Sequence, residues 1–378
     1  MEEWKEYRLG DIISIKSGFA YKGQEIGFGG NYLLGMGCVS FKEKFLDSGV
    51  RLYNGDCSEK YCVRAGDLVL ATRQQSENQP ILGMPAIIPS TYNGKKIIVG
   101  ANLYKVENVS DFDNLYLYWL LKTPSYVNYI KSCQTGTTVR MITKANIENY
   151  SFCAPNSEKR RKILSILSSL DEKIEVNRRI NDNLEQQAQA LYKQWFVDNC
   201  NESWNKRKLS DFFNVITGKK DANYSTDNGE FPFFTCSQDI LKAPNYSFDG
   251  AAILLAGNGD FNVKRYIGRF EAYQRTYVLI PFDQRYHSFL YLTIKYYLQE
   301  ITGGSRGSVI KFITKGNIAD FEISIPNDDI SNKLEILDSL YANIDINTKE
   351  NQNLAILRDT LLPRLMSGEL SVNDVLVY

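Results

Sequence analysis

The sequence is poor in the residues that build metal centres and nucleophilic sites. Among its 378 residues there is one histidine, His287, and none of its seven cysteines forms a C-x-x-C pair. A single imidazole and unpaired thiols do not make up the ligand set of structural zinc, so we expect no metal site. An odd number of cysteines without paired spacing is typical of reduced thiols in a cytoplasmic protein, and it excludes the disulfide-rich secreted class.

Long apolar runs are missing as well. The longest, 115–121 and 251–256, are far shorter than the roughly 18 residues of a membrane span, and the N-terminus is too polar for a signal peptide. With 43% hydrophobic and 23% charged residues, the composition is that of an ordinary globular protein, and the length predicts two or three domains. We therefore expect a cytoplasmic protein that does not enter a membrane.

Catalytic motifs are absent too. The chain contains no G-x-x-x-x-G-K-[ST] phosphate loop and no N/D-P-P-aromatic motif of amino-methylating enzymes, and 257–260 is too short for a dinucleotide site. The single histidine stands beside an aromatic helical segment, where we expect it to cap or pack rather than to act as a base. The sequence therefore predicts no catalytic residue.

Neither sign of charge is in excess, because 44 Lys and Arg balance 44 Asp and Glu. A neutral chain argues against nucleic acid at first sight, but the balance is uneven along the sequence. Residues 1–155 carry 17 basic and 15 acidic side chains and 201–326 carry 15 and 13, whereas 327–378 carry 4 and 9. A net charge of zero therefore does not exclude DNA binding. It indicates weak DNA affinity for this chain alone, with partners contributing phosphate contacts.

What the sequence does contain is a long internal repeat. Residues 4–12 match 204–212, and the block ITKANI at 142–147 matches ITKGNI at 313–318. The matched blocks keep the same order, and their offset shrinks mainly between 18 and 115, so the middle of each half diverges. A repeat of this length is a duplicated domain rather than a solenoid unit.

We predict a mixed α/β (α+β) fold with two similar globular domains, 1–155 and 201–326. Short apolar stretches between Gly, Asn and Asp predict strands, and 114–131 and 287–301 predict aromatic-rich helices. Each domain is followed by a spacer helix, the first in 156–200 and the second, with a tail, in 327–378. At about 1.5 Å per residue, the 38 residues without Gly or Pro at 158–195 would form a helix of roughly 57 Å.

Both spacer helices show a heptad seam, with apolar residues at spacings of three and four. The centre of each seam is polar and consists of two asparagines: Asn177 and Asn181 in the first helix, Asn347 and Asn351 in the second. In an antiparallel coiled coil these pairs would face each other and fix the register. The alternative places the asparagines on a solvated edge while Val176 and Ile180 pack in the core. Lys333 and Arg358 interrupt the second seam.

Polar and basic clusters occur at equivalent places in the two domains. One follows a predicted buried strand, and the other surrounds the repeated I-T-K-x-N-I block. Arg, Lys, Asn and Gln on loops contact base edges, and small hydroxyl residues suit phosphates. The candidate DNA-binding residues are Arg73, Gln74, Gln75, Asn78, Thr137, Thr138, Arg140, Lys144, Asn258, Asn262, Lys264, Arg265, Gln274, Arg275, Arg306, Ser308, Lys311 and Lys315. For any single residue, a solvated loop is the alternative.

Together these blocks resemble the specificity (S) subunit of Type I restriction–modification systems. The resemblance covers essentially the whole chain and lies in GDLVLAT at 66–72, ILG at 81–83, AYQRTY at 272–277, the G-T/S-x-x-x-x-I-T-K-x-N-I blocks from Gly136 and Gly307, and LLPRLMSG at 361–368. It implies two target recognition domains, each contacting one half of a split asymmetric site in double-stranded DNA. It does not identify the base-contacting residues, because the middle of each domain diverges.

The resemblance also implies partners. The long helices would set the gap between the half-sites and dock two modification (methyltransferase) subunits, and restriction (endonuclease and translocase) subunits would join that core. S-adenosylmethionine would be bound by the modification subunit and not by this chain. Two alternatives stay open: a free-standing DNA methyltransferase with degenerate motifs, and a coiled-coil scaffold that binds only protein. The missing cofactor signature argues against the first, and the duplicated polar clusters argue against the second.

Overall fold

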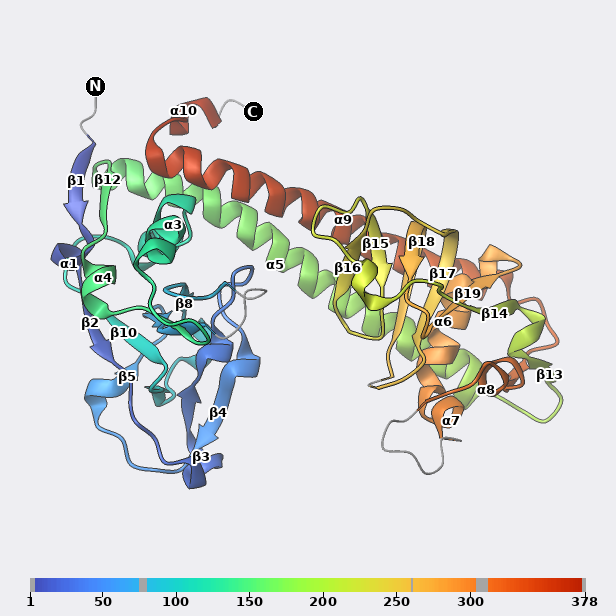
Figure 1. Cartoon of the computed structure of the whole chain (residues 1–378). Helices are drawn as coiled ribbons and strands as arrows, with labels where there is room; N and C mark the ends of the chain where they lie inside the picture. Colours follow the sequence, from blue (N-terminus) through green and yellow to red (C-terminus); the bar gives the residue numbers. More distant parts are fainter. Residues whose placement is uncertain (1–3, 75–79, 260, 304–311, 376–378) are drawn as a thin grey trace. The chain divides into compact units, whose positions relative to one another are not determined.

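The computed structural model describes residues 4–74, 80–259, 261–303 and 312–375 (Figure 1). The chain divides into two compact units: Met1–Ile174 with Gln352–Tyr378, and Glu175–Asn351. Each unit contains one repeat and parts of both long helices, so this division differs from the four predicted segments, in which the helices stand apart from the domains.

Two four-stranded sheets form the scaffold of the first unit. The first has the order β2 (Ile13–Ser17), β10 (Leu103–Asn108), β6 (Leu68–Ala71), β8 (Pro85–Ile87), and the second has the order β4 (Val50–Tyr53), β3 (Ile26–Leu34), β9 (Ile97–Val99), β5 (Cys62–Val63). Two short ladders pair β1 (Lys5–Arg8) with β12 (Ser151–Ala154), and β7 (Arg73–Gln74) with β11 (Arg140–Met141). Strand β6 is buried throughout, which is why its sequence is apolar without alternation.

This unit also contains the short helices α1 (Leu9–Ile12), α2 (Asn114–Leu120), α3 (Pro124–Cys133), α4 (Lys144–Glu148) and α10 (Val372–Val375). The prediction of one helix over 114–131 is wrong, because the chain turns between α2 and α3. Pro124 occupies the first turn of α3, and the Thr123 hydroxyl caps that helix by accepting from the amide of Tyr126.

The second unit repeats the frame of the first. Its six-stranded sheet has the order β14 (Phe213–Thr217), β19 (Thr276–Pro281), β17 (Phe248–Ala256), β18 (Val263–Ala272), β15 (Phe231–Phe234), β16 (Ile240–Ala243), and β13 (Asn205–Lys208) pairs with β20 (Glu322–Ile325). The strands β14-β19-β17-β18 correspond to β2-β10-β6-β8, and β13-β20 corresponds to β1-β12. This confirms the predicted duplicated mixed α/β fold, and the remaining strands differ where the sequences diverge.

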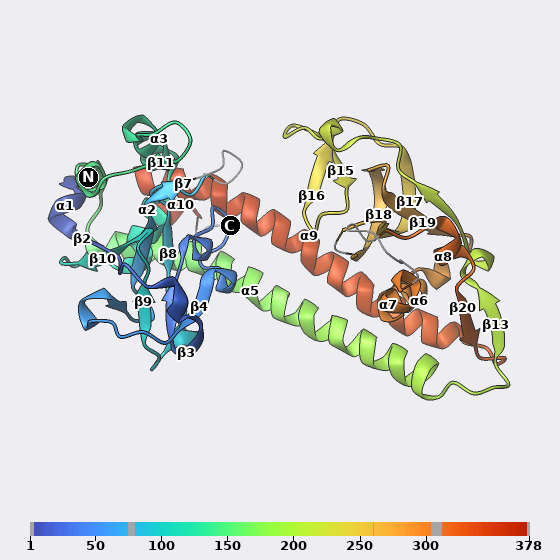
Figure 2. The same cartoon turned by 60° about the horizontal axis from the view of Figure 1, so that its bottom comes forward.

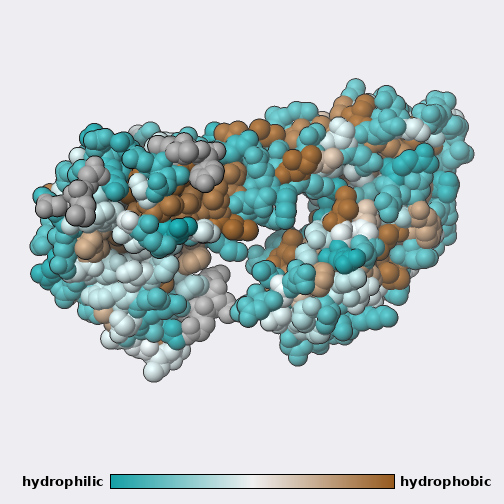
Figure 3. All heavy atoms as spheres, turned by 90° about the horizontal axis from the view of Figure 1, so that it is seen from above, coloured by the Kyte–Doolittle hydropathy of each residue, from teal (hydrophilic) through white to brown (hydrophobic). Residues whose placement is uncertain are grey.

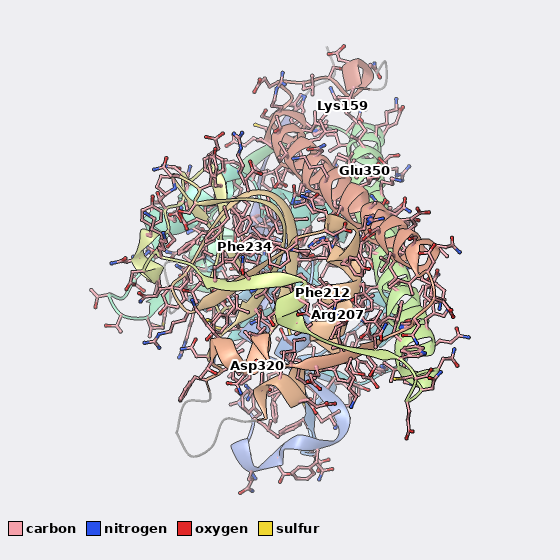
Figure 4. All side chains as sticks on the ribbon, turned by 90° about the vertical axis from the view of Figure 1, so that its right-hand side faces the viewer. Lys159, Arg207, Phe212, Phe234, Asp320 and Glu350 are labelled. Carbon is pink, nitrogen blue, oxygen red and sulfur yellow. The ribbon has the colours of Figure 1, made fainter. Side chains whose placement is uncertain are left out.

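The helices of this unit are α6 (His287–Tyr296), α7 (Leu298–Thr302) and α8 (Lys315–Ala319). The prediction of a single helix over 287–301 is wrong as well, since Tyr297 leaves helical geometry between α6 and α7. Arg207 belongs to β13, and its guanidinium lies over the ring of Phe212 at 5.0 Å (Figure 4). Lys208 pairs with Asp320 at 3.0 Å and ties β13 to the end of α8.

The two long helices are α5 (Ser157–Lys193) and α9 (Ser331–Ser367), which run side by side (Figure 2). Within the second unit, Asn177 Nδ2 donates to Asn351 Oδ1 at 2.9 Å, and Asn347 Nδ2 donates to Asn181 Oδ1 at 2.9 Å. Rising numbers on α5 meet falling numbers on α9, so the helices are antiparallel there. These are the facing pairs that the seam predicts.

The surroundings of Asn177 decide between the two arrangements of the seam. Asn177 is 1% exposed and also donates to Glu350 Oε2 at 2.7 Å. Glu350 lies on α9 (Figure 4). Val176 and Ile180, by contrast, are 47% and 43% exposed. The alternative with a solvated asparagine edge is therefore wrong, because the amides occupy the interface and the two aliphatic side chains face outward.

Candidate nucleic-acid interface

Two predicted clusters of the first domain lie far apart in the sequence and meet in the structure. β7 pairs with β11, so that Arg73 lies opposite Met141 and Gln74 lies opposite Arg140. Side chains alternate along a strand, and accordingly Arg73 is exposed whereas Gln74 is buried. The strand end after β6 and the segment before α4 therefore form one surface.

Backbone hydrogen bonds fix this surface to a turn that precedes β10. The amide of Thr72 donates to the carbonyl of Asn102 at 3.2 Å, and the carbonyl of Thr72 accepts from the amide of Ile142 at 3.2 Å. One strand-end residue thus holds the turn on one side and the segment before α4 on the other. We call this arrangement the strand-end frame.

The second domain contains the same strand-end frame. The amide of Gly257 donates to the carbonyl of Arg275 at 2.8 Å, and the carbonyl of Gly257 accepts from the amide of Ile313 at 3.1 Å. The next residue, Asn258, forms an antiparallel bridge with Phe312. Gly257 therefore takes the place of Thr72, and the polar clusters of this domain meet in the same way.

A tyrosine that is half-buried in the first domain and buried in the second supports each strand-end frame. Tyr104 donates its hydroxyl to the carbonyl of Ile142 at 3.1 Å, and Tyr277 donates to the carbonyl of Ile313 at 2.7 Å. Burial raises the pKa of both phenols, so they remain neutral donors. These tyrosines are not among the residues predicted from the sequence, although a tyrosine at the second position of the equivalent strand in both halves is a usable signal.

The repeated I-T-K-x-N-I block has a structural explanation. Its threonine caps a short helix: Thr143 Oγ1 accepts from the amide of Asn146 at 3.2 Å, and Thr314 Oγ1 accepts from the amide of Asn317 at 3.3 Å. The lysine that follows is the first residue of α4 or α8. The block therefore places one lysine beside each strand-end frame.

In both frames, the backbone of the turn packs directly against the Cα atom of a glycine. A Cβ atom on Gly18 would lie 2.1 Å from the carbonyl oxygen of Gly100, and one on Gly218 would lie 2.0 Å from that of Ala272. Both contacts are with backbone, which cannot rotate away. The repeated glycine therefore permits the close approach that shapes the turn.

We expect Gly218→Ala to lower the free energy of unfolding by about 2 kcal/mol, because the added methyl must displace the turn before Thr276. Equilibrium unfolding in urea measures this loss. Gly316→Ala is the matched control in the same domain, since its Cβ would have only ordinary contacts, the nearest at 3.7 Å. Equal stability of the two variants would contradict the close approach.

A pocket of about 400 Å³ opens at the frame of the second domain. Its lining comes from the strand end, the turn and the bridge segment: Thr217, Gly257, Asn258, Gln274, Arg275, Tyr277, Phe312 and Ile313. Gln274 and Arg275 are exposed, and Gln274 Nε2 is 3.4 Å from Asp221 Oδ2. The pocket thus presents amide and guanidinium donors beside an aromatic ring, which is the chemistry that contacts base edges and sugar–phosphate.

Several other candidates also lie on accessible surface. Thr137, Thr138 and Lys315 are exposed, and Arg140 is half-buried. The ammonium of Lys144 lies over the ring of Tyr104 at 5.8 Å. Around the frame of the first domain, the structure therefore brings together hydroxyl and basic side chains of the kind that contact phosphates.

Two predicted residues point inward, and the structure corrects their assignment. Gln74 is 7% exposed, and its Oε1 accepts from the amide of Leu82 at 3.2 Å. Asn262 is 8% exposed, and its Nδ2 donates to the carbonyl of Cys236 at 2.8 Å. Both amides satisfy buried backbone groups, so they hold loops in place instead of facing DNA.

Lys264 and Arg265 lie on β18 and also depart from the prediction. Lys264 donates to the carbonyl of Ser237, and burial lowers the pKa of its ammonium group. Arg265 Nη1 lies 2.8 Å from Asp345 Oδ1 on α9, and its guanidinium stacks on Tyr341 at 4.6 Å. With a side chain only 10% exposed, Arg265 attaches its domain to a helix and does not present a free cation.

Five remaining candidates lie outside the described residues: Gln75, Asn78, Arg306, Ser308 and Lys311.

The single histidine is buried, as the expectation that it packs requires. His287 is 3% exposed and its Nε2 lies 3.1 Å from the carbonyl oxygen of Ala252, while burial lowers its pKa to about 4. Within 4–74, 80–259, 261–303 and 312–375, no three His, Cys, Asp or Glu side chains gather to hold a metal ion.

One face of the molecule is largely hydrophilic, with separate apolar patches (Figure 3). No helix in the described part of the chain is both long and apolar enough to cross a bilayer.

Comparison with known proteins agrees with the duplicated architecture. The family model described as "Type I restriction modification DNA specificity domain" matches residues 1–186 and again 201–355. The solved S subunit of a Type I restriction–modification system from M. genitalium shares the fold, with a TM-score of 0.56 at 18% identity, over 97% of this chain and 96% of that one.

Curated relatives give the same family. The specificity subunit of the Type I restriction enzyme EcoDI from Escherichia coli is 38% identical over 174 residues, which are 44% of this chain and only 39% of that protein. The HindI specificity subunit from Haemophilus influenzae is 24% identical over 98% of this chain and 100% of its own length. The family model covers most of the chain in two copies, and the chain therefore belongs to the Type I restriction–modification DNA specificity family.

Proposed function

We propose that this chain is the specificity subunit of a Type I restriction–modification complex and that each domain recognises one half of a bipartite, asymmetric DNA site. The observation that carries the proposal is the strand-end frame, which occurs in both domains and gathers polar clusters that are distant in the sequence. A duplicated frame with different side chains suits two half-sites of different sequence.

The chain acts without chemistry of its own in this proposal. The buried, neutral His287 is unsuited to base catalysis at the surface. Adenine methylation is assigned to two modification subunits, which bind S-adenosylmethionine, and restriction subunits complete the complex. Membership of the family argues against a free-standing methyltransferase and against a scaffold that binds only protein.

The long helices are the proposed docking site of the modification subunits. Within the second unit, the outer face of α5 has a pocket of about 320 Å³ lined by Val176, Arg179, Ile180, Asn183 and Leu184. Ile346 of α9 is 64% exposed. Aliphatic side chains exposed on a helix pair are typical of a protein interface, and the acidic balance of 327–378 makes DNA contact by this helix unfavourable.

Exchange of residues 201–326 for those of a relative with another target tests the proposal. We expect the hybrid, assembled with its modification subunit, to methylate a site changed in one half only, because each domain contacts its own half-site. Sequencing of methylated adenines measures the result. A change in both halves would refute the assignment of one half-site to each domain, and absence of DNA binding by the wild-type complex would favour the protein scaffold.

A further inference from the structure

The two strand-end frames correspond residue by residue through their hydrogen bonds. Thr72 and Gly257 each donate to the carbonyl of a turn residue, which is Asn102 in the first domain and Arg275 in the second. The residue that follows the strand end is Arg73 in the first domain and Asn258 in the second, and each opposes the segment before the short helix. The backbone thus creates two equivalent positions in each domain, one at the strand end and one at the turn.

The side chains at these two positions are exchanged between the domains. In the first domain, the residue after the strand end is Arg73 and the turn residue is Asn102. In the second domain, the residue after the strand end is Asn258 and the turn residue is Arg275. Each frame therefore holds one guanidinium and one carboxamide. In DNA recognition, arginine pairs with the O6 and N7 atoms of guanine and asparagine with the N6 and N7 atoms of adenine.

In the part of the chain that the structure describes, nothing occupies the polar groups of these four side chains. Within the described residues, Arg73, Asn102, Asn258 and Arg275 make no side-chain hydrogen bond or ion pair. Arg73 and Arg275 are exposed, and the two asparagines are half-buried. This separates them from Gln74, Asn262, Lys264 and Arg265, each of which has a side-chain hydrogen bond within the protein. A base contact by these four side chains breaks no hydrogen bond among the described residues.

An exposed apolar side chain stands at the same place in both frames. Met141 opposes Arg73 and is 42% exposed, and Phe312 opposes Asn258 and is 55% exposed. A large hydrophobic side chain left in water beside free donors is characteristic of a contact surface. An exposed apolar side chain beside the base-contacting groups suits the methyl group of thymine in the major groove.

We propose that Arg73 with Asn102, and Arg275 with Asn258, are the base-contacting pairs of the two domains, each binding one guanine and one adenine edge in the major groove. This rests on the proposed function and extends it to specific residues. Because the pairs are exchanged, the guanine and adenine contacts occupy opposite positions relative to the frame in the two half-sites. This exchange makes the recognised site asymmetric although the frames are alike.

The test uses the complex of this chain with its modification subunit and a library of randomised DNA sites, with methylated adenines identified by sequencing. We expect Asn102→Ala and Arg73→Ala each to relax the preference at one base pair of the first half-site by about 5- to 150-fold. Asn258→Ala and Arg275→Ala should do the same in the second half-site. In each case the other half-site keeps its preference.

Arg64→Ala is the matched control, since Arg64 is an exposed arginine of the first domain outside the frame. It should leave the preference at both half-sites unchanged. Thermal unfolding of each variant should match the wild type, because the four side chains have no partner among the described residues to lose. If one of these four variants unfolded at a lower temperature than the wild type, that side chain would contribute to folding stability, and the claim that it has no partner would be refuted.

Three outcomes distinguish the possible failures. Unchanged preferences in all four variants, with a specific wild-type complex, would overturn the base-contacting pairs and leave the proposed function standing. Uniform weakening at all sequences, with a smaller salt dependence, would make the residues phosphate contacts and would also overturn the pairs. A wild-type complex without any sequence preference would overturn the proposed function itself.

Discussion

Asp171→Ala is expected to lower the free energy of unfolding of the first unit by about 3 kcal/mol. Asp171 Oδ1 lies 2.8 Å from Arg358 Nη1, and Asp171 Oδ2 lies 2.8 Å from Lys44 Nζ. The side chains of Asp171 and Arg358 are only 10% and 14% exposed. Removing the carboxylate takes one of two anions from a largely buried guanidinium, since Arg358 Nη2 keeps Asp359 Oδ1 at 2.8 Å. It also leaves the Lys44 ammonium without its anion beside that guanidinium, which is costly.

Hydrogen-exchange mass spectrometry measures this loss, because it reports the opening free energy of each unit from its own peptides. Glu172→Ala is the matched control, since Glu172 is the next residue of α5 and is exposed. Replacing the buried pair together, as Asp171→Leu with Arg358→Met, should restore most of the stability, because no unpaired guanidinium remains. If the amides of the first unit were equally protected from hydrogen exchange in Asp171→Ala and Glu172→Ala, the stabilising role of the Asp171 carboxylate would be contradicted.

The ion pairs of Asp171 with Arg358 and Lys44 show why a charged residue, Arg358, interrupts the apolar seam of α9. Arg358 pairs with α5 and lies over the ring of Trp119 at 5.5 Å, and Lys44 of the same domain lies over that ring at 5.8 Å. In the second unit, Arg265 pairs with Asp345 of α9, and Lys295 of α6 pairs with Glu185 of α5 at 2.6 Å. The first domain is thus attached to α5 by an ion pair and to α9 by a cation–π contact, and the second domain is attached to both helices by ion pairs. In the first unit, the charged residue at a seam position, Arg358, makes the attachment.

Local signals in the sequence were sufficient for the repeated fold and the helix pairing. Helical periodicity and the absence of Gly and Pro predicted α5, and the central asparagines predicted which residues face each other. The breaks between α2 and α3 and between α6 and α7 were not predicted, because aromatic residues continue across them. Pro124 was the available signal for the first break, since proline is favoured in the first turn of a helix.

The candidate site was predictable only in part, because the sequence does not show which way a side chain points. Arg73 and Gln74 are neighbours of similar polarity, yet one is exposed and the other is buried, since β7 is a two-residue strand with no visible alternation. Asn102 was missed because its turn lies inside an apolar stretch. The pairing of β10 with β6 and the hydrogen bonds from Thr72 bring it beside the polar cluster.

The second unit is expected to lose about 3 kcal/mol of stability between pH 7 and pH 4 through His287 alone. Burial is the main cause that lowers the pKa of this imidazole to about 4, and the charge of Arg265 acts in the same direction. In the unfolded chain the pKa returns to about 6.5. Below pH 6.5 the unfolded state therefore binds a proton that the folded state excludes, so stability falls as the pH drops and levels off below pH 4.

Urea unfolding at several pH values, compared between the wild type and His287→Gln, isolates this contribution. Carboxyl groups that titrate near pH 4 affect both proteins equally, so the difference between the two curves belongs to the imidazole. Glutamine keeps a donor for the carbonyl of Ala252, which the ring reaches at 3.1 Å, and it takes up no proton in this range. Because the chain has no other histidine, identical slopes between pH 6.5 and pH 4 would show that His287 is accessible to protons in the folded protein, and its burial beneath β17 would be wrong.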